Sequence, residues 1–108
     1  MGEPAIGDVV IVPFPFSDGS ASKKRPAAVV AIADDRDVIV CQITSRPYSS
    51  KHPVPLTGRD FASGSLPVDS YIRPEKLFTA SSRSLSTVAT IAPETVAVTR
   101  ETIRALFA

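Results

Sequence analysis

Gly7-Asp8-Val9-Val10-Ile11-Val12-Pro13-Phe14 is the stretch that decides the fold of this 108-residue chain. After Asp8 its β-branched and aromatic residues follow one another without a polar residue, which is typical of a buried β-strand. Proline lacks the backbone N–H that a central strand donates. Pro13 and Pro15 therefore predict that this strand lies at a sheet edge, or leaves the sheet near its end. The polar segment Ser17–Ser22 follows and predicts a loop.

Two more apolar runs, Ala27–Ile32 and Val38–Thr44, predict the second and third strands. The polar residues Asp34–Asp37 join these runs, and a connection this short favours antiparallel pairing between neighbours. Together with the first run they predict a three-stranded meander, in which each strand pairs with the next along the chain.

The middle of the chain predicts shorter strands. Ser45–Pro55 is polar and broken by prolines, which indicates a loop with one short strand. Val68–Thr79 contains strand-like pieces that Pro74 is expected to split. Ser86–Ile91 alternates well enough to predict a closing strand.

The last residues predict a helix from Pro93 onwards. Proline suits a first helical turn, and Glu94 suits the positive end of the helix dipole. Ala92 offers no side-chain cap at the expected N-cap position, which predicts a frayed start. One apolar stripe recurs at helical spacing, formed by Val96, Thr99, Ile103, Leu106 and Phe107. The predicted fold class is mainly β: a small, strongly twisted, antiparallel β-barrel with a C-terminal α-helix.

Length and composition favour a single domain over residues 1–108. With 44% apolar residues, a chain of this size can bury a core without covalent or metal crosslinks. Its 12 Lys and Arg nearly cancel its 11 Asp and Glu, which leaves a formal net charge of +1. This balance excludes a protein that holds long DNA by bulk electrostatics, but it is compatible with a local basic patch.

Counts of reactive residues narrow the chemistry further. The single cysteine, Cys41, excludes an internal disulfide and any multi-cysteine zinc site. The single histidine, His52, excludes an acid–base pair of histidines within one chain. We therefore expect no metal and no cofactor. No apolar stretch approaches the roughly 20 residues that span a bilayer, and the N-terminus lacks a signal-peptide pattern, so we expect a cytoplasmic protein without a membrane partner.

The order and spacing of four segments resemble the MazF/PemK family of toxin endoribonucleases from type II toxin–antitoxin systems. The segments are Gly7–Phe16, Lys24-Arg25-Pro26-Ala27-Ala28-Val29-Val30, Gln42-Ile43-Thr44-Ser45-Arg46 and Arg73-Pro74-Glu75-Lys76-Leu77-Phe78-Thr79. The resemblance runs from Gly7 to the C-terminal helix. It implies an SH3-like barrel, a homodimer, metal-independent cleavage of single-stranded RNA at a short sequence, and inhibition by a cognate antitoxin.

The resemblance also implies which residues act on RNA. Arg25 would be the main catalytic residue, because its fork of donors matches phosphate oxygens and its charge stabilises the transition state. Thr44 would donate its hydroxyl to the scissile phosphate, with Ser45 as an auxiliary. The further expected substrate contacts are Lys24 and Arg46 to phosphates, Phe16 to an unpaired base by stacking, and Lys76 to phosphate, at a position where many relatives carry glutamine.

Two alternatives stay open at this level. The related CcdB toxins share the fold but bind and poison DNA gyrase without cleaving RNA. A degenerate, inactive relative that serves only as a binding module would keep the same residues. Arg25 and Thr44, at positions that match the nuclease family, favour the ribonuclease.

Overall fold

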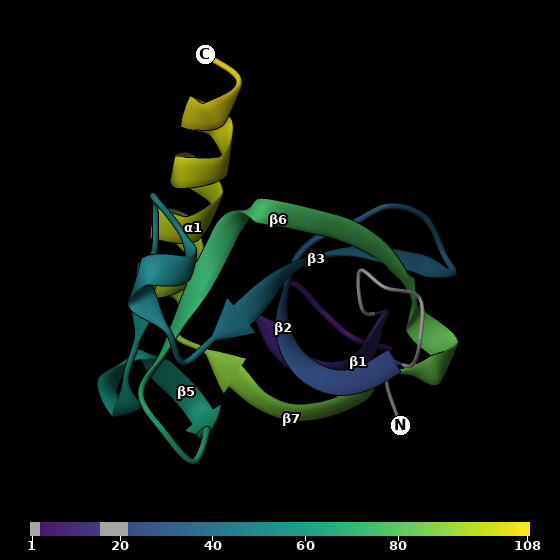
Figure 1. Cartoon of the computed structure of the whole chain (residues 1–108). Helices are drawn as coiled ribbons and strands as arrows, with labels where there is room; N and C mark the ends of the chain where they lie inside the picture. Colours follow the sequence, from purple (N-terminus) through teal and green to yellow (C-terminus); the bar gives the residue numbers. More distant parts are fainter. Residues whose placement is uncertain (1–2, 16–21) are drawn as a thin grey trace.

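A computed structural model describes residues 3–15 and 22–108. Over these residues the chain forms seven strands, three single 3₁₀ turns and one α-helix (Figure 1). The strands are β1 (Asp8–Pro15), β2 (Ser22–Ile32), β3 (Asp37–Thr44), β4 (Val54–Leu56), β5 (Phe61–Gly64), β6 (Ser70–Ser81) and β7 (Ser86–Ile91). The 3₁₀ turns are η1 (Pro47–Ser49), η2 (Gly58–Asp60) and η3 (Ser82–Ser84), and the helix is α1 (Pro93–Leu106).

The strands form one antiparallel sheet in the order β4-β6-β3-β2-β1-β7-β5. The sheet curls strongly on itself, so that Figure 1 shows a nearly closed barrel with α1 standing against one end. The meander β1-β2-β3 is confirmed: Val9 lies opposite Ala28, and Ala28 lies opposite Cys41. The predicted class, an antiparallel β-barrel with a C-terminal helix, is therefore confirmed.

The expectation that the first strand lies at a sheet edge, or leaves the sheet near its end, holds for its far end and not for its first half. β1 pairs with β2 on one side and, over Asp8–Ile11, with β7 on the other. Beyond Ile11 only the pairing with β2 continues. Pro13 and Pro15 thus stand where the ladder to β7 has already ended, which is how a strand rich in proline can lie inside the sheet.

Pro74 does not split the strand that contains it, as the sequence had suggested. β6 runs unbroken over Ser70–Ser81, and its register against β3 shifts in the middle. Cys41 lies opposite Leu77, whereas Ile43 lies opposite Ile72. The residues of β6 between these two pairs bulge away from one-to-one pairing, so the missing N–H of Pro74 breaks no regular ladder there.

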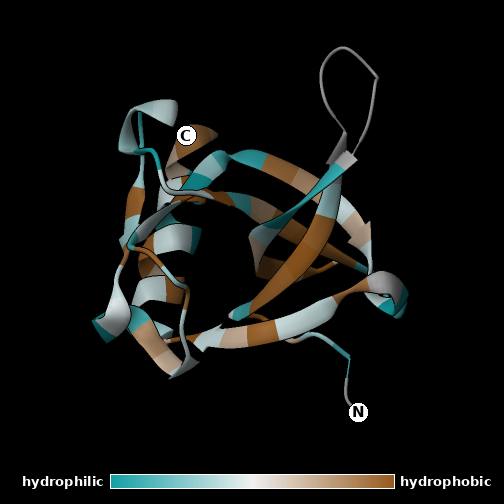
Figure 2. Ribbon diagram, turned by 60° about the horizontal axis from the view of Figure 1, so that its bottom comes forward, coloured by the Kyte–Doolittle hydropathy of each residue, from teal (hydrophilic) through white to brown (hydrophobic). Residues whose placement is uncertain are grey.

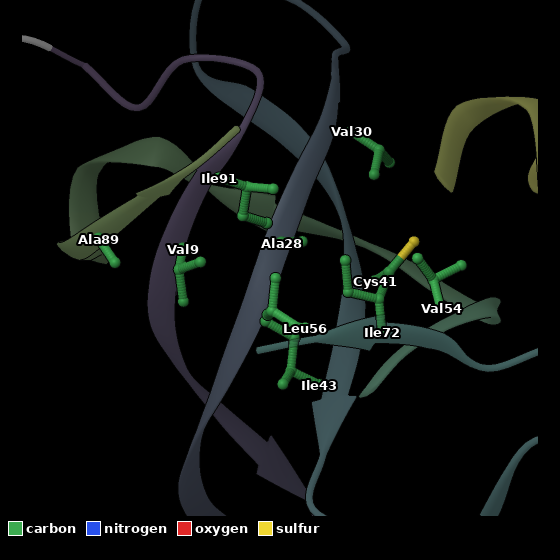
Figure 3. Packing of buried hydrophobic residues seen from close by; sticks show 10 residues of the cluster. All are labelled: Val9, Ala28, Val30, Cys41, Ile43, Val54, Leu56, Ile72, Ala89 and Ile91. Carbon is green, nitrogen blue, oxygen red and sulfur yellow. The ribbon is translucent and has the colours of Figure 1, made fainter. Parts of the chain in front are cut away.

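The central strands are buried on both faces, which explains why their sequences are continuous apolar runs rather than alternating ones. Figure 2 shows these apolar residues, in brown, on the strands that run through the middle of the barrel. One cluster, drawn in Figure 3, consists of Val9, Ala28, Val30, Cys41, Ile43, Val54, Leu56, Ile72, Ala89 and Ile91. The other consists of Val10, Val12, Ala27, Val29, Val38 and Val40.

The helix covers one end of the barrel by its contacts with β6 and β4. Val96 and Ile103 pack against the first cluster, and Thr99, which lies between them in the sequence, is buried. The predicted stripe is therefore confirmed as far as Ile103, whereas Phe107 is 78% exposed. In the part of the chain described here, no helix combines the length and the apolar character needed to cross a bilayer.

The start of α1 is held by a residue from another segment. Ala92 provides no side-chain cap, as its sequence predicts. Its backbone N–H instead donates to the carbonyl oxygen of Asp60 at 2.7 Å, and the Thr95 hydroxyl donates to Asp60 Oδ1 at 2.7 Å. The same carboxylate accepts from the backbone N–H and the hydroxyl of Thr57 through Oδ2, at 2.8 and 3.0 Å. A carboxylate at this place also complements the helix dipole.

Candidate functional site

A cleft lies where β2, β3 and β6 meet the segment that follows β3. This cleft has a volume of about 880 Å³. Its cationic lining residues are Lys23, Arg25, Arg46, Arg73 and Lys76. No Asp or Glu among the described residues lines it. A chain of net charge +1 thus gathers five of its cations on one concave surface, the local basic patch that its composition allowed.

Arg25 lies on β2 just beyond the paired part of the β2–β3 ladder. Ala27 faces Gln42 in that ladder, and two residues further along each strand stand Arg25 and Thr44, both of which line the cleft. The side chain of Arg25 is partly exposed and forms no hydrogen bond or ion pair with any described residue. Its guanidinium is therefore available to an anion in the cleft.

Thr44 is the last residue of β3 and is partly buried. Its Oγ1 accepts a hydrogen bond from the backbone N–H of Arg46 at 3.1 Å. A hydroxyl that accepts in this way keeps its own proton for donation to a third group. The local turn after β3 therefore fixes the position of the Thr44 oxygen and leaves a donor beside Arg25.

A hydrogen-bonded network that the sequence did not predict borders the cleft. Arg73 donates from Nη1 to Oε1 of Gln42 at 3.1 Å and from Nε to Oε2 of Glu75 at 3.2 Å. The other carboxylate oxygen of Glu75 accepts from the Ser50 hydroxyl at 2.8 Å. Burial alone would raise the pKa of Glu75, but the hydrogen bonds from Ser50 and Arg73 and the Arg73 charge hold it below its ordinary value.

Residues 5–107 match the family model described as the PemK-like, MazF-like toxin of type II toxin-antitoxin systems. The chain belongs to this toxin family. The family that the four sequence segments suggested is therefore confirmed. No curated protein matches the chain.

Solved structures show that this MazF-like toxin shares its fold with other MazF proteins. MazE-MazF (Form-II) from Deinococcus radiodurans is 20% identical, with a TM-score of 0.78 over 99% of this chain and 97% of that one. MazF (Form-I) from the same organism is 21% identical, with a TM-score of 0.76 over 99% and 98% of the two chains. An endoribonuclease in complex with its cognate antitoxin from a mycobacterial species is 16% identical, with a TM-score of 0.69 over 99% and 95%.

The cleft of this MazF-like toxin contains most of the predicted site residues. Arg25, Thr44, Ser45, Arg46 and Lys76 all line it, although they come from three different parts of the chain. The structure does not test what each of them does, so their roles stay predictions. They nonetheless share one surface, which is the geometry that those roles require.

Two predicted residues are not in this group. Lys24 is not among the lining residues, whereas Lys23 is. β2 begins at Ser22, five residues before the predicted strand, and side chains alternate between the faces of a strand. Lys23 and Arg25 therefore share the face that borders the cleft. Phe16 lies outside the described residues.

The groups that commonly bind metals or act as nucleophiles are dispersed in this MazF-like toxin. Over residues 3–15 and 22–108, no three His, Cys, Asp or Glu side chains are arranged to hold a metal ion. Cys41 is fully buried, and its thiol points to the carbonyl oxygen of Pro74 at 4.0 Å. Burial, together with the negative charge of Glu75, raises the pKa of Cys41 to about 12, which makes it an unreactive core residue.

Proposed function

We propose that this MazF-like toxin is an endoribonuclease that cleaves single-stranded RNA at a short sequence without a metal ion. The observation that carries the proposal is the cleft, in which five cations gather and Arg25 and Thr44 stand at corresponding places on neighbouring strands. Positive charge on a concave surface attracts the phosphates of a nucleic acid. The cations would also supply the charge that a metal ion supplies in other nucleases.

The proposed reaction needs only the RNA itself as nucleophile. The 2′-oxygen of one nucleotide attacks the adjacent phosphorus, the bond between phosphorus and the 5′-oxygen breaks, and a 2′,3′-cyclic phosphate remains. The 2′-hydroxyl loses a proton and the departing 5′-oxygen gains one. Negative charge builds up on the non-bridging oxygens between these events. Donors aimed at that charge are the main source of catalysis in such a site.

Arg25 and Thr44 would stabilise the negative charge on the non-bridging oxygens in different ways. A guanidinium is a poor base and a strong, planar donor, so Arg25 would stabilise the phosphorane rather than accept the proton. The Thr44 hydroxyl, whose oxygen is already held by the Arg46 N–H, would donate to a non-bridging oxygen. Ser45, Arg46 and Lys76 would hold the flanking nucleotides, as would Lys23 on the same side of β2 as Arg25.

We also infer that this toxin acts as a homodimer in the cytoplasm and is held inactive by a cognate antitoxin. The support is the family, together with solved relatives that include MazE-MazF and an endoribonuclease in complex with its cognate antitoxin. An antitoxin segment that carries carboxylates would pair with cations of the cleft, such as Arg25 and Arg46, whose side chains have no partner within residues 3–15 and 22–108, and block access of phosphate.

The test incubates the purified protein with a long unstructured RNA in EDTA and maps the fragment ends. We expect cleavage at a short sequence, products that end in a cyclic phosphate or its 3′-phosphate, and no cleavage where the 2′-hydroxyl is replaced by hydrogen. Arg25→Ala should lower the rate about 10²- to 10³-fold with an unchanged circular dichroism spectrum.

The matched control is Arg100→Ala, which removes the same charge from an exposed position on α1. This variant should cleave like the wild type. A requirement for magnesium, or cleavage of the 2′-deoxy substrate, would overturn the proposed chemistry. An Arg25→Ala variant that cleaves at the wild-type rate would show that Arg25 takes no part in the proposed reaction.

A further inference from the structure

Arg73 differs from the other cations of the cleft. Its side chain is 21% exposed and is hydrogen-bonded to both Gln42 and Glu75. The side chains of the other four cations form no hydrogen bond or ion pair with the described part of the chain: Lys23, Arg25, Arg46 and Lys76. The cleft thus contains four cations that can move to meet a phosphate and one whose direction is already fixed.

This difference has a physical consequence for what each cation can bind. The carboxylate of Glu75 offsets part of the charge of Arg73, so Arg73 adds less to the attraction of phosphate than an unpaired cation would. Its orientation, by contrast, is set at two of its five N–H groups, and the three others remain for a ligand in the cleft. A fork of donors whose charge is paired and whose direction is fixed is poorly suited to charge neutralisation and well suited to directional hydrogen bonds with a base.

We propose that Arg73 is a specificity-determining residue that reads one unpaired base of the RNA. Two parallel donors of a guanidinium match a base with two adjacent acceptors. Guanine offers O6 and N7, and cytosine offers O2 and N3, whereas adenine and uracil place an acceptor next to a donor. Arg73 therefore selects guanine or cytosine at one position of the cleaved sequence. This inference rests on the proposed ribonuclease function and adds the chemistry of one recognition position to it.

Glu75 is a positioning residue for Arg73 in this scheme. It does not line the cleft itself. One of its oxygens holds Arg73 on β6, and the other is held by Ser50 in the segment after η1. The Ser50 oxygen in turn accepts from the backbone N–H of His52 at 2.9 Å. The fork of Arg73 is thereby fixed relative to the segment that carries Arg46, where the RNA backbone would lie.

The test measures base preference at every position around the cut with a single-stranded RNA library that is randomised over the recognition window. The wild type should show one position at which guanine or cytosine is preferred. Arg73→Lys keeps the charge and loses the fork, so it should reduce that preference about tenfold or more and leave the salt dependence of binding unchanged. Arg104→Lys, which alters the exposed Arg104–Glu101 pair on α1, is the matched control.

Glu75→Gln separates a positioning role from a merely structural one. Loss of its charge should strengthen binding of RNA overall and steepen its salt dependence, while the preference at the same position falls. If Glu75 had a merely structural role, Glu75→Gln would weaken RNA binding and the base preference together. Glu101→Gln removes a carboxylate from the corresponding pair on α1 and should change neither. Thermal unfolding of each variant checks that it is folded. If Arg73→Lys does not fold, the base preference of Glu75→Gln alone decides the test.

The outcomes distinguish this inference from the function on which it rests. A wild type that does not cleave RNA defeats the proposed function, and the inference with it. A wild type that cleaves selectively, with the same selectivity in Arg73→Lys and Glu75→Gln, defeats the inference alone. The inference also fails if the position at which Arg73→Lys and Glu75→Gln lose selectivity is one where the wild type prefers adenine or uracil.

Discussion

Removal of the Asp60 carboxylate should loosen the contact between α1 and the barrel. Asp60 lies at the end of η2 and joins three partners that are otherwise separate: Thr57 in its own turn, and Thr95 and Ala92 at the start of α1. Asp60→Ala removes every side-chain part of this contact. Asp60→Asn keeps the shape and one carbonyl oxygen but loses the charge.

The magnitude follows from the partners of this carboxylate. Its hydrogen bonds with Thr57 form a capping box, whose loss typically costs about 1 kcal/mol. The bond from the Thr95 hydroxyl at 2.7 Å connects residues 35 apart in the chain. A bond to a charged group contributes about 1.5–3 kcal/mol, and the lower end applies because Asp60 is partly exposed. We therefore expect Asp60→Ala to lose about 2–3 kcal/mol, or at least about 8 °C in Tm for a domain of this size.

The stability contribution of the Asp60 carboxylate should depend on pH. Burial alone would raise the pKa of Asp60, but its hydrogen bonds with Thr57 and Thr95 outweigh burial and hold the pKa below its ordinary value. A depressed pKa stabilises the folded state above the unfolded-state pKa of about 4, and this contribution is lost as the pH falls through the folded-state pKa. The difference between wild type and Asp60→Asn should therefore be constant near neutral pH and shrink below about pH 4.

The assay is thermal or urea unfolding of wild type, Asp60→Ala and Asp60→Asn between pH 3 and 8. Asp35→Ala is the control, because Asp35 is exposed in the turn between β2 and β3 and has no hydrogen bond to a described residue. It should change stability by less than about 0.5 kcal/mol. Equal stability of wild type and Asp60→Ala, or an equal loss in Asp35→Ala, would refute the reasoning.

The other predictions concern the cleft and the core. Thr44→Val should lower the rate of RNA cleavage about 10- to 100-fold, while Thr44→Ser keeps most of it; a fully active Thr44→Val would show that the hydroxyl is not used. Lys23→Ala should weaken RNA binding and reduce the slope of log affinity against log salt by about 0.7, and Lys24→Ala should do so less because it lies outside the cleft lining; equal effects in a binding titration would contradict the assigned strand face. Cys41, with its pKa raised to about 12 by burial and the charge of Glu75, should react with iodoacetamide at pH 8 only as fast as the protein unfolds; rapid labelling of the folded protein would show that the thiol is accessible.

The sequence by itself determined the central strands, the helix and the family. The runs that contain Val9–Val12, Ala27–Ile32 and Val38–Thr44 are continuously apolar and β-branched, and such a run has few stable alternatives to a buried strand. Short polar connections then fix which strands are neighbours. Arg25 and Thr44 were expected at one site because of the resemblance to the family, and the cleft contains both.

Tertiary structure alone decided the partners of these elements over long distances. The pairing of β1 with β7 joins segments about eighty residues apart, and it placed the first half of β1 inside the sheet, while at Pro13 and Pro15 only the pairing with β2 continues. The register shift of β3 against β6 let Pro74 remain within a strand. Neither feature leaves a local pattern in the sequence, because each depends on which residues the folded barrel brings opposite one another.

The same reason separates what was predicted of the cleft from what was not. Successive side chains of a strand point to opposite faces. Because β2 already begins at Ser22, Lys23 lines the cleft on the same face as Arg25, whereas the predicted Lys24 does not. Gln42 and Arg73 lie 31 residues apart, and Ser50 and Glu75 lie 25 apart. Residue type and the resemblance to the family led to the expectation that cations here bind RNA. Only the register of β6, with its bulge, determined that one of those cations would be paired and held in a fixed direction.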